Sequence, residues 1–176
     1  MRRYLQHTLL FGIAILVIVA DQITKSLIRA NLTLLESFTP IPALADFFTL
    51  INTTNTGAAF GMFKAGGNIF TIVAIIVVGA IIYYYPRLPD GQIGIRVALG
   101  LQLGGAIGNL IDRLLYGPVT DFIFFHWYDR LNAPIFNLAD LSITCGVIIL
   151  ALLMWQESRL EKKTQAATPE PVAPSE

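Results

Sequence analysis

Two aspartates lie where one apolar stretch of the chain ends and the next begins. Asp121 follows the stretch that closes near Leu115, and Asp140 lies near the start of the stretch that continues to Trp155. Hydrocarbon tolerates carboxylates poorly, so acids at such edges indicate a functional site. When two carboxylates are held close together, one keeps its proton and the other can act as a base. Such a pair can activate water for attack on an amide carbonyl.

The structural alternative is two unrelated acids at helix ends. Asp140 falls in a first helical turn, where a carboxylate favourably meets the positive end of the helix dipole. From the residues alone, this interpretation and the catalytic one both stay open.

Further polar residues lie near the ends of the apolar stretches. Asp21 and Lys25 are four residues apart, so they share one helix face and can form an ion pair. Asn109 and Arg113 have the same spacing and could bind polar groups of a substrate or stabilise charge nearby. Asn137 is placed to hydrogen-bond one of the two acids. The candidate supporting residues are Asp21, Lys25, Asn55, Gly57, Asn109, Asp112, Arg113 and Asn137.

Other catalytic chemistries lack their residues. No His-Glu-x-x-His segment for zinc, no Gly-x-Ser-x-Gly elbow and no phosphate-binding P-loop is present. His7 and His126 fall in segments that we assign to opposite membrane faces. The single cysteine, Cys145, lies inside an apolar stretch, which favours packing over reactivity. We therefore expect neither a metal nor a cofactor.

The composition is that of a membrane protein. Hydrophobic residues make up 55% of the chain, charged residues 14%, and the formal net charge is zero, so no basic surface indicates a nucleic-acid partner. A membrane-spanning helix needs about 20 apolar residues. Four stretches qualify and predict one domain over residues 1–156, followed by a disordered tail over 157–176. The predicted spans are residues 5–23, 68–85, 97–115 and 135–155.

The first span has an alternative interpretation as a cleaved signal peptide. It is long for that purpose and leads directly into the polar segment from Asp21 to Lys25, so an uncleaved helix is favoured. In the third span Gly100, Gly104 and Gly108 line one face, which predicts close approach of another helix.

The segments between the spans carry their own signals. Residues 31–67 are too polar to cross a bilayer and contain two β-rich runs, 47–52 and 55–63, which predict a hairpin-like pair. Such a small sheet could rest on the membrane surface. Residues 116–134 form a second predicted loop, whose many aromatic side chains suit the headgroup layer.

The distribution of arginine and lysine predicts the orientation. Most basic residues fall on one side of a four-span arrangement, so the positive-inside rule places both termini in the cytoplasm. The residues on that side are Arg2, Arg3, Arg87, Arg96, Arg159, Lys162 and Lys163. Lys25, Asn55, Asp121 and Asp140 then converge at the outer face.

Five short motifs in this order resemble those of the lipoprotein signal peptidases, the signal peptidase II family. Each motif is weak alone, but together they cover the chain from Arg2 to about Trp155. They are Asp21-Gln22-x-x-Lys25, Asn55-x-Gly57-Ala58-Ala59-Phe60, Gly108-Asn109-x-x-Asp112-Arg113, Val119-x-Asp121-Phe122 and Phe136-Asn137-x-Ala139-Asp140. One departure is Phe124, where the family often has another acid.

The resemblance implies an integral membrane aspartic endopeptidase of the bacterial inner membrane. Its fold would be a four-transmembrane-helix bundle with a small periplasmic β-sheet cradle and a membrane-surface segment. It would cut prolipoproteins just before a diacylglyceryl-modified cysteine, in contact with membrane lipid, and would be inhibited by globomycin. Asp121 and Asp140 map onto the family's catalytic dyad. The family's supporting polar residues map onto Asp21, Lys25, Asn55, Asn109, Asp112, Arg113 and Asn137.

Two other functions stay open from the sequence. A small ion- or proton-coupled carrier would use Asp21, Lys25, Asp112 and Arg113 as a relay, but it predicts acids near the bilayer centre. A non-catalytic assembly subunit would use the glycine-lined face, and acid-to-amide changes would leave its function largely intact.

Overall fold

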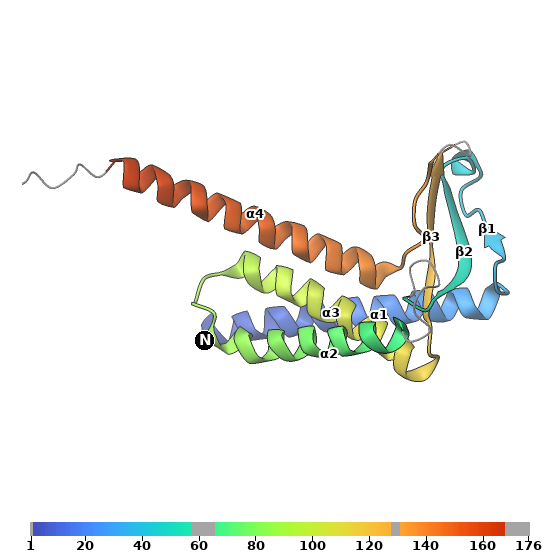
Figure 1. Cartoon of the computed structure of the whole chain (residues 1–176), viewed down its shortest axis with the longest axis horizontal. Helices are drawn as coiled ribbons and strands as arrows, with labels where there is room; N and C mark the ends of the chain where they lie inside the picture. The colour runs from blue at the N-terminus through green and yellow to red at the C-terminus, as the bar shows by residue number, and fades with distance from the viewer. Residues whose placement is uncertain (1, 58–65, 128–130, 168–176) are drawn as a thin grey trace, which may run out of the picture.

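The computed structural model describes residues 2–57, 66–127 and 131–167. Four long helices lie beside one another, and a small antiparallel sheet lies across one end of them (Figure 1). The helices are α1 (Arg2–Asn31), α2 (Gly66–Tyr84), α3 (Ile93–Leu115) and α4 (Leu138–Ala167). The sheet has the order β1 (Ser37–Phe38), β2 (Phe48–Asn55), β3 (Val119–Trp127) and β4 (Leu131–Asn132). Two short 3-10 helices are η1 (Pro42–Leu44) and η3 (Tyr85–Arg87).

All four helices are long and apolar enough to cross a bilayer. A helix satisfies its own backbone hydrogen bonds, which is what a segment in hydrocarbon requires. Large apolar side chains point outward, as with Leu16 and Ile76, which are 69% and 62% exposed. The protein is therefore a multi-pass membrane protein, as the composition predicts.

The ends of α4 differ from the sequence-based boundaries. The predicted fourth span starts at residue 135, whereas α4 starts at Leu138, because Asn137 is its N-cap. At the other end α4 continues through Ala167, so residues 157–167 are helical where we expected disordered chain. Residues 168–176 of the predicted tail lie outside the described residues.

Helix α3 is the central helix and contacts the other three. Its glycines permit this: a Cβ added at Gly100 or Gly104 would lie 2.8 Å from a backbone carbonyl oxygen of α1. Gly105, one residue round the helix, meets the Ala139 carbonyl of α4 in the same way. The close helix approach predicted from the glycine spacing is confirmed. The buried apolar cluster around Leu10 and Leu103 lies on the α1 side of α3.

The sheet joins segments about seventy residues apart, as the Leu50–Ile123 pairing shows. The first predicted run, 47–52, lies largely in β2. Because β2 pairs with β1 and β3, the predicted hairpin within residues 47–63 is wrong for the part of the chain that the structure describes. Residues 58–63 of the second run lie outside that part. Four aromatic residues of the predicted loop, Phe122, Phe124, Phe125 and Trp127, lie in β3 instead, which pairs with β2. Phe125 packs on Phe47 and Phe48, with ring centroids 5.3 and 5.4 Å apart.

The arrangement brings polar residues from distant segments to the sheet end of the bundle. The N-terminus of α1 and the turn between α2 and α3 lie at the opposite end (Figure 1). At the sheet end, α1 and α3 finish, α4 begins, and β2 and β3 cross above them. This junction contains the two acids singled out in the sequence.

Candidate active site

The start of α4 fixes the position of Asp140. The Asn137 side-chain oxygen accepts a hydrogen bond from the Asp140 backbone N–H at 3.0 Å. The Asp140 carboxylate in turn accepts one from the Asn137 backbone N–H at 3.3 Å. This reciprocal arrangement is a capping box, which satisfies N–H groups that the first helical turn leaves unpaired. Asp140 is thereby held in the first turn, where the helix dipole favours a negative charge.

Strand β3 carries Asp121 to the same place. The strand follows a turn at Gly117, whose φ of 87° favours glycine. The Asp121 carboxylate is 2% exposed. It accepts hydrogen bonds from the side-chain amides of Asn137 at 2.6 Å and Asn55 at 2.9 Å. Asn55 reaches it because β2 pairs with β3 here, with Thr53 opposite Asp121.

One carboxamide therefore bridges the two acids. The Asn137 nitrogen donates to Asp121, and the Asn137 oxygen accepts from the backbone of Asp140. The two acids, which lie in separate elements, are brought together by a residue that the sequence analysis expected to bond only one of them.

Asn109 of α3 supports Asp140 from the other side. Its side-chain nitrogen donates to the Asp140 carboxylate at 2.7 Å. Its side-chain oxygen accepts from Lys25 at 2.9 Å and from the Asn137 amide at 3.1 Å. These bonds hold the Asp140 carboxylate in place. The predicted contact of Asn109 with polar groups of a substrate stays a prediction.

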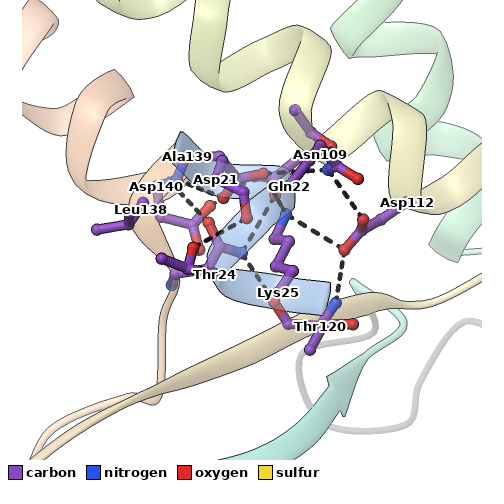
Figure 2. Close-up of polar contacts among 12 residues, drawn as sticks. Asp21, Gln22, Thr24, Lys25, Asn109, Asp112, Thr120, Leu138, Ala139 and Asp140 are labelled. Atoms are coloured by element: carbon purple, nitrogen blue, oxygen red, sulfur yellow. Dashed lines mark hydrogen bonds and ion pairs between the residues drawn. The ribbon is translucent and has the colours of Figure 1, made fainter. Parts of the chain in front are cut away.

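Beneath the two acids lies a buried ionic cluster. Lys25 has no exposed side-chain surface, and its ammonium lies 2.9 Å from Asp21 and 3.2 Å from Asp112 (Figure 2). Removing such charges from water is costly unless each one is paired and hydrogen-bonded. Here the ammonium has three partners, the two carboxylates and the oxygen of Asn109. The predicted Asp21–Lys25 pair is confirmed, and Asp112 joins it.

The two carboxylates of this cluster anchor the elements that carry Asp121 and Asp140. Asp21 accepts a hydrogen bond from the backbone N–H of Ala139 at 3.0 Å, one residue before Asp140. Asp112 accepts one from the backbone N–H of Thr120 at 2.9 Å, one residue before Asp121. Lys25, held between these carboxylates, thus fixes α4 and β3 relative to α1 and α3.

Two further residues belong to this cluster and are absent from the site residues predicted from the sequence, although Gln22 stands in the first of the five motifs. Gln22 donates to the Gly108 carbonyl at 3.0 Å and to Asp112 at 3.1 Å. Arg29 donates to the Thr120 hydroxyl at 2.9 Å and lies 3.6 Å from Asp112. The signal for Arg29 was its spacing, since Asp21, Lys25 and Arg29 recur every four residues on one face of α1.

The environment of Asp121 perturbs its protonation. Burial raises the pKa of its carboxyl group, and the nearby charge of Asp140 raises it further. Hydrogen bonds from Asn55 and Asn137 and the charge of Lys25 act in the opposite direction, and the resulting pKa is about 6. A carboxyl group with this pKa exchanges its proton near neutral pH, as an acid-base group must.

A cavity of about 630 Å³ opens beside these residues. Asn109, Arg113 and Asp140 line its polar end, together with Asn55 and Gly57 of the β2 end. Apart from Gln102 of α3, apolar side chains of α2, α3 and α4 line the rest of it. These are Phe70, Val73, Ala74, Val77, Ala106, Ile143 and Val147.

At its polar end the cavity is shaped by Gly57 and Arg113. Gly57 has a φ of 74°, and a side chain there would collide with the Phe70 ring. The Arg113 guanidinium lies 5.8 Å from the same ring. Its Nε is buried and has no hydrogen-bond partner among the described residues. In the part of the chain that the structure describes, no three His, Cys, Asp or Glu side chains are grouped to hold a metal ion.

Comparison with known proteins identifies relatives over most of the chain. Residues 13–156 match the family model described as signal peptidase (SPase) II. The lipoprotein signal peptidase of Pseudomonas aeruginosa PAO1 is 39% identical over 151 residues, which cover 84% of this chain and 88% of the relative. The lipoprotein signal peptidase of Bacillus subtilis 168 is 42% identical over 157 residues, 89% of this chain and 99% of the relative.

Two solved structures have a similar fold. Both are described as bacterial membrane enzymes determined by the in meso method, at 2.3 and 1.9 Å resolution. The first has a TM-score of 0.73 and 34% sequence identity, and the match covers 93% of this chain and 94% of that one. The second has the same TM-score and 36% identity, with coverage of 82% and 91%.

Proposed function

This chain belongs to the signal peptidase II family, and we propose that it is an aspartic endopeptidase with Asp121 and Asp140 as its catalytic dyad. In this proposal it removes the signal peptide from prolipoproteins, cutting on the N-terminal side of the diacylglyceryl-modified cysteine. The observation that carries the assignment of the dyad is the chain of amides between the two carboxylates. Asn137 donates to the Asp121 carboxylate and to the Asn109 side-chain oxygen, and Asn109 donates to the Asp140 carboxylate. The charge of Asp140 also raises the pKa of the Asp121 carboxyl group, and two acids coupled in this way are suited to share one proton.

The proposed reaction needs only this dyad and water. Asp121, the more deeply buried acid, holds the shared proton and donates a hydrogen bond to the oxygen of the scissile carbonyl. Asp140 takes a proton from water as the water oxygen bonds to the carbonyl carbon. The resulting tetrahedral intermediate collapses when the amide nitrogen takes a proton from the dyad and the C–N bond breaks. No covalent bond to the enzyme forms at any step.

The cavity suits a substrate that is part peptide and part lipid. Its apolar walls on α2 and α4 match a signal segment or acyl chains, and its polar end contains Asp140. The unpaired Nε of Arg113 lies at that end and can bind a carbonyl of the substrate. We propose that globomycin-type cyclic peptides occupy this same cavity. The remaining predicted supporting residues, Asp21, Lys25, Asn55, Asn109, Asp112 and Asn137, then position the dyad.

We propose that residues 1–156 form the peptidase domain in the bacterial inner membrane, with the sheet as a cradle at the periplasmic face. The arrangement of the termini supports this orientation. The N-terminus of α1 and η3, which contains Arg87, lie at the end opposite the sheet (Figure 1). With the positive-inside rule, that end and both termini are cytoplasmic. The diacylglyceryl group would then stay in the outer leaflet beside the dyad, with part of the chain lying on the membrane surface.

The experiment is cleavage of a lipidated prolipoprotein by the purified protein in proteoliposomes. Asp121→Asn and Asp140→Asn should each abolish cleavage while the protein remains inserted and folded. The matched control is Asp90→Asn in the α2–α3 turn, which should cleave normally. Globomycin should inhibit the wild-type protein. Normal turnover by either dyad variant would overturn the proposal.

A further inference from the structure

One polar side chain lies deep in the otherwise apolar part of the cavity. Gln102 of α3 lines it together with Ala106 and Asn109, which follow on the same helix face at spacings of four and seven residues. The stem of Gln102 packs on α4, because a Cβ added at Gly146 would lie 2.7 Å from its Cγ. Leucine or methionine could fill this position without a polar group.

The side-chain nitrogen of Gln102 is unsatisfied. Its Nε2 is buried and has no hydrogen-bond partner within the described part of the chain. An unpaired amide donor is costly in an apolar, membrane-embedded site. The terminal torsion of glutamine is broad, so rotation about it can turn the NH₂ group toward the cavity. These properties indicate a partner that binds in the cavity.

The position of Gln102 along α3 identifies which part of a bound peptide it meets. Asn109, which bonds Asp140, is seven residues further along, so at about 1.5 Å per residue Gln102 lies about 10 Å from Asn109 along the axis of α3. An extended peptide advances about 3.3 Å per residue. The side chain therefore meets a bound extended chain about three residues from the scissile bond, on the side of the signal segment.

An extended signal segment has unpaired groups at that point. A helix must unwind before its scissile carbonyl can reach the dyad, and unwinding frees backbone carbonyls that hydrocarbon cannot satisfy. We propose that the Gln102 carboxamide donates a hydrogen bond to one such carbonyl, about three residues before the cut. The inference rests on the proposed peptidase function and makes Gln102 a positioning residue that sets the register of the substrate.

The test combines an enzyme variant with a substrate series. Gln102→Met keeps the length of the side chain and removes its hydrogen-bonding groups. The substrates are synthetic lipidated peptides in which one amide at a time, from two to five residues before the cut, is replaced by an ester. The ester weakens the preceding carbonyl as an acceptor. The matched control is Gln156→Met, because Gln156 lies on α4 outside this cavity.

In the wild-type protein one ester position should lower kcat/KM by about two- to tenfold, the size of one lost hydrogen bond. Gln102→Met should lower kcat/KM of the all-amide peptide by a similar factor and should show no further loss with that ester. Gln156→Met should behave as wild type. A purely structural role of Gln102 would lower kcat/KM of all peptides equally.

The outcomes separate this inference from the proposed function. Suppose that the wild type cleaves the all-amide peptide, and that every ester lowers kcat/KM by the same factor in the wild type and in Gln102→Met. The inference about Gln102 is then wrong, and the peptidase assignment stands. If the wild type leaves the all-amide lipidated peptide uncut, the proposed function fails and the inference fails with it.

Discussion

Asn137→Ser tests the carboxamide that joins the two acids. Serine is as good an N-cap as asparagine, so α4 should still begin at the same residue. The change removes the donor that lies 2.6 Å from the Asp121 carboxylate. Asp121 then remains buried with one side-chain hydrogen bond, from Asn55. The variant therefore separates the bridge from the cap.

The magnitude follows from what that hydrogen bond does. A hydrogen bond to a charged group contributes about 1.5–3 kcal/mol, which corresponds to about one to two pH units of pKa. The bond favours the ionised form of Asp121 and so lowers its pKa. Its loss should raise the pKa of Asp121 from about 6 to between about 7 and 8.

The assay is the pH dependence of kcat/KM on a lipidated peptide, which reports the free enzyme. Because Asp121 acts in its protonated form in the proposed mechanism, wild-type kcat/KM should fall as the pH rises through about 6. In Asn137→Ser this fall should move to higher pH, and the maximal rate should drop because the two acids are held less firmly. Asn31→Ser, a change at the exposed end of α1, serves as the control. An unshifted profile in folded Asn137→Ser would refute the bridging role.

Two further changes test the framework beneath the dyad. Lys25→Met leaves the buried carboxylates of Asp21 and Asp112 without their cation and should lower the free energy of unfolding by about 3–5 kcal/mol. The double variant Lys25→Met/Asp112→Asn should recover part of this loss. Thermal unfolding in detergent measures both variants, and an unchanged unfolding midpoint for Lys25→Met would contradict the role of the cluster. Gly104→Ala places a Cβ 2.7 Å from a side-chain carbon of α1 and should cost about 1–3 kcal/mol. Gly12→Ala, whose Cβ meets nothing within 4 Å, should be neutral or slightly stabilising, and equal effects of the two alanines would argue against close α1–α3 packing.

Much of the helical framework could be predicted because hydrocarbon imposes strict requirements on sequence. A spanning segment must be long and nearly uncharged, so the four spans were visible as apolar stretches. The glycine spacing at 100, 104 and 108 predicted the packing face of α3, because only glycine permits so close an approach. The Asp21–Lys25 pair followed from helical spacing in the same way.

The sheet could not be predicted correctly, because its pairing is between distant segments. β2 and β3 are separated by α2 and α3, and nothing local in residues 47–63 indicates that the partner is near residue 123. From the sequence, the aromatic residues of β3 predict a loop in the headgroup layer, because such residues suit a membrane interface and a strand equally well.

The sequence indicates which polar residues gather at the sheet end of the bundle, but it indicates only part of the contacts that they make there. The motifs include Asp112, but its hydrogen bond from the backbone N–H of Thr120 could not be predicted, because it depends on how β3 packs at the end of α3. The carrier interpretation predicts a relay of Asp21, Lys25, Asp112 and Arg113. In the structure the first three side chains are fully buried and bonded to one another and to backbone groups, which is the arrangement of a structural cluster.

Infrared titration of the protonated carboxyl band tests most directly whether Asp121 and Asp140 form one coupled pair. In the wild-type protein a band that is absent from Asp121→Asn should titrate near pH 6. Because the charge of Asp140 raises the pKa of Asp121, Asp140→Asn should shift this titration to lower pH. A band that titrates at the same pH with and without the Asp140 charge would show that the two carboxylates act independently, and the dyad would have to be abandoned.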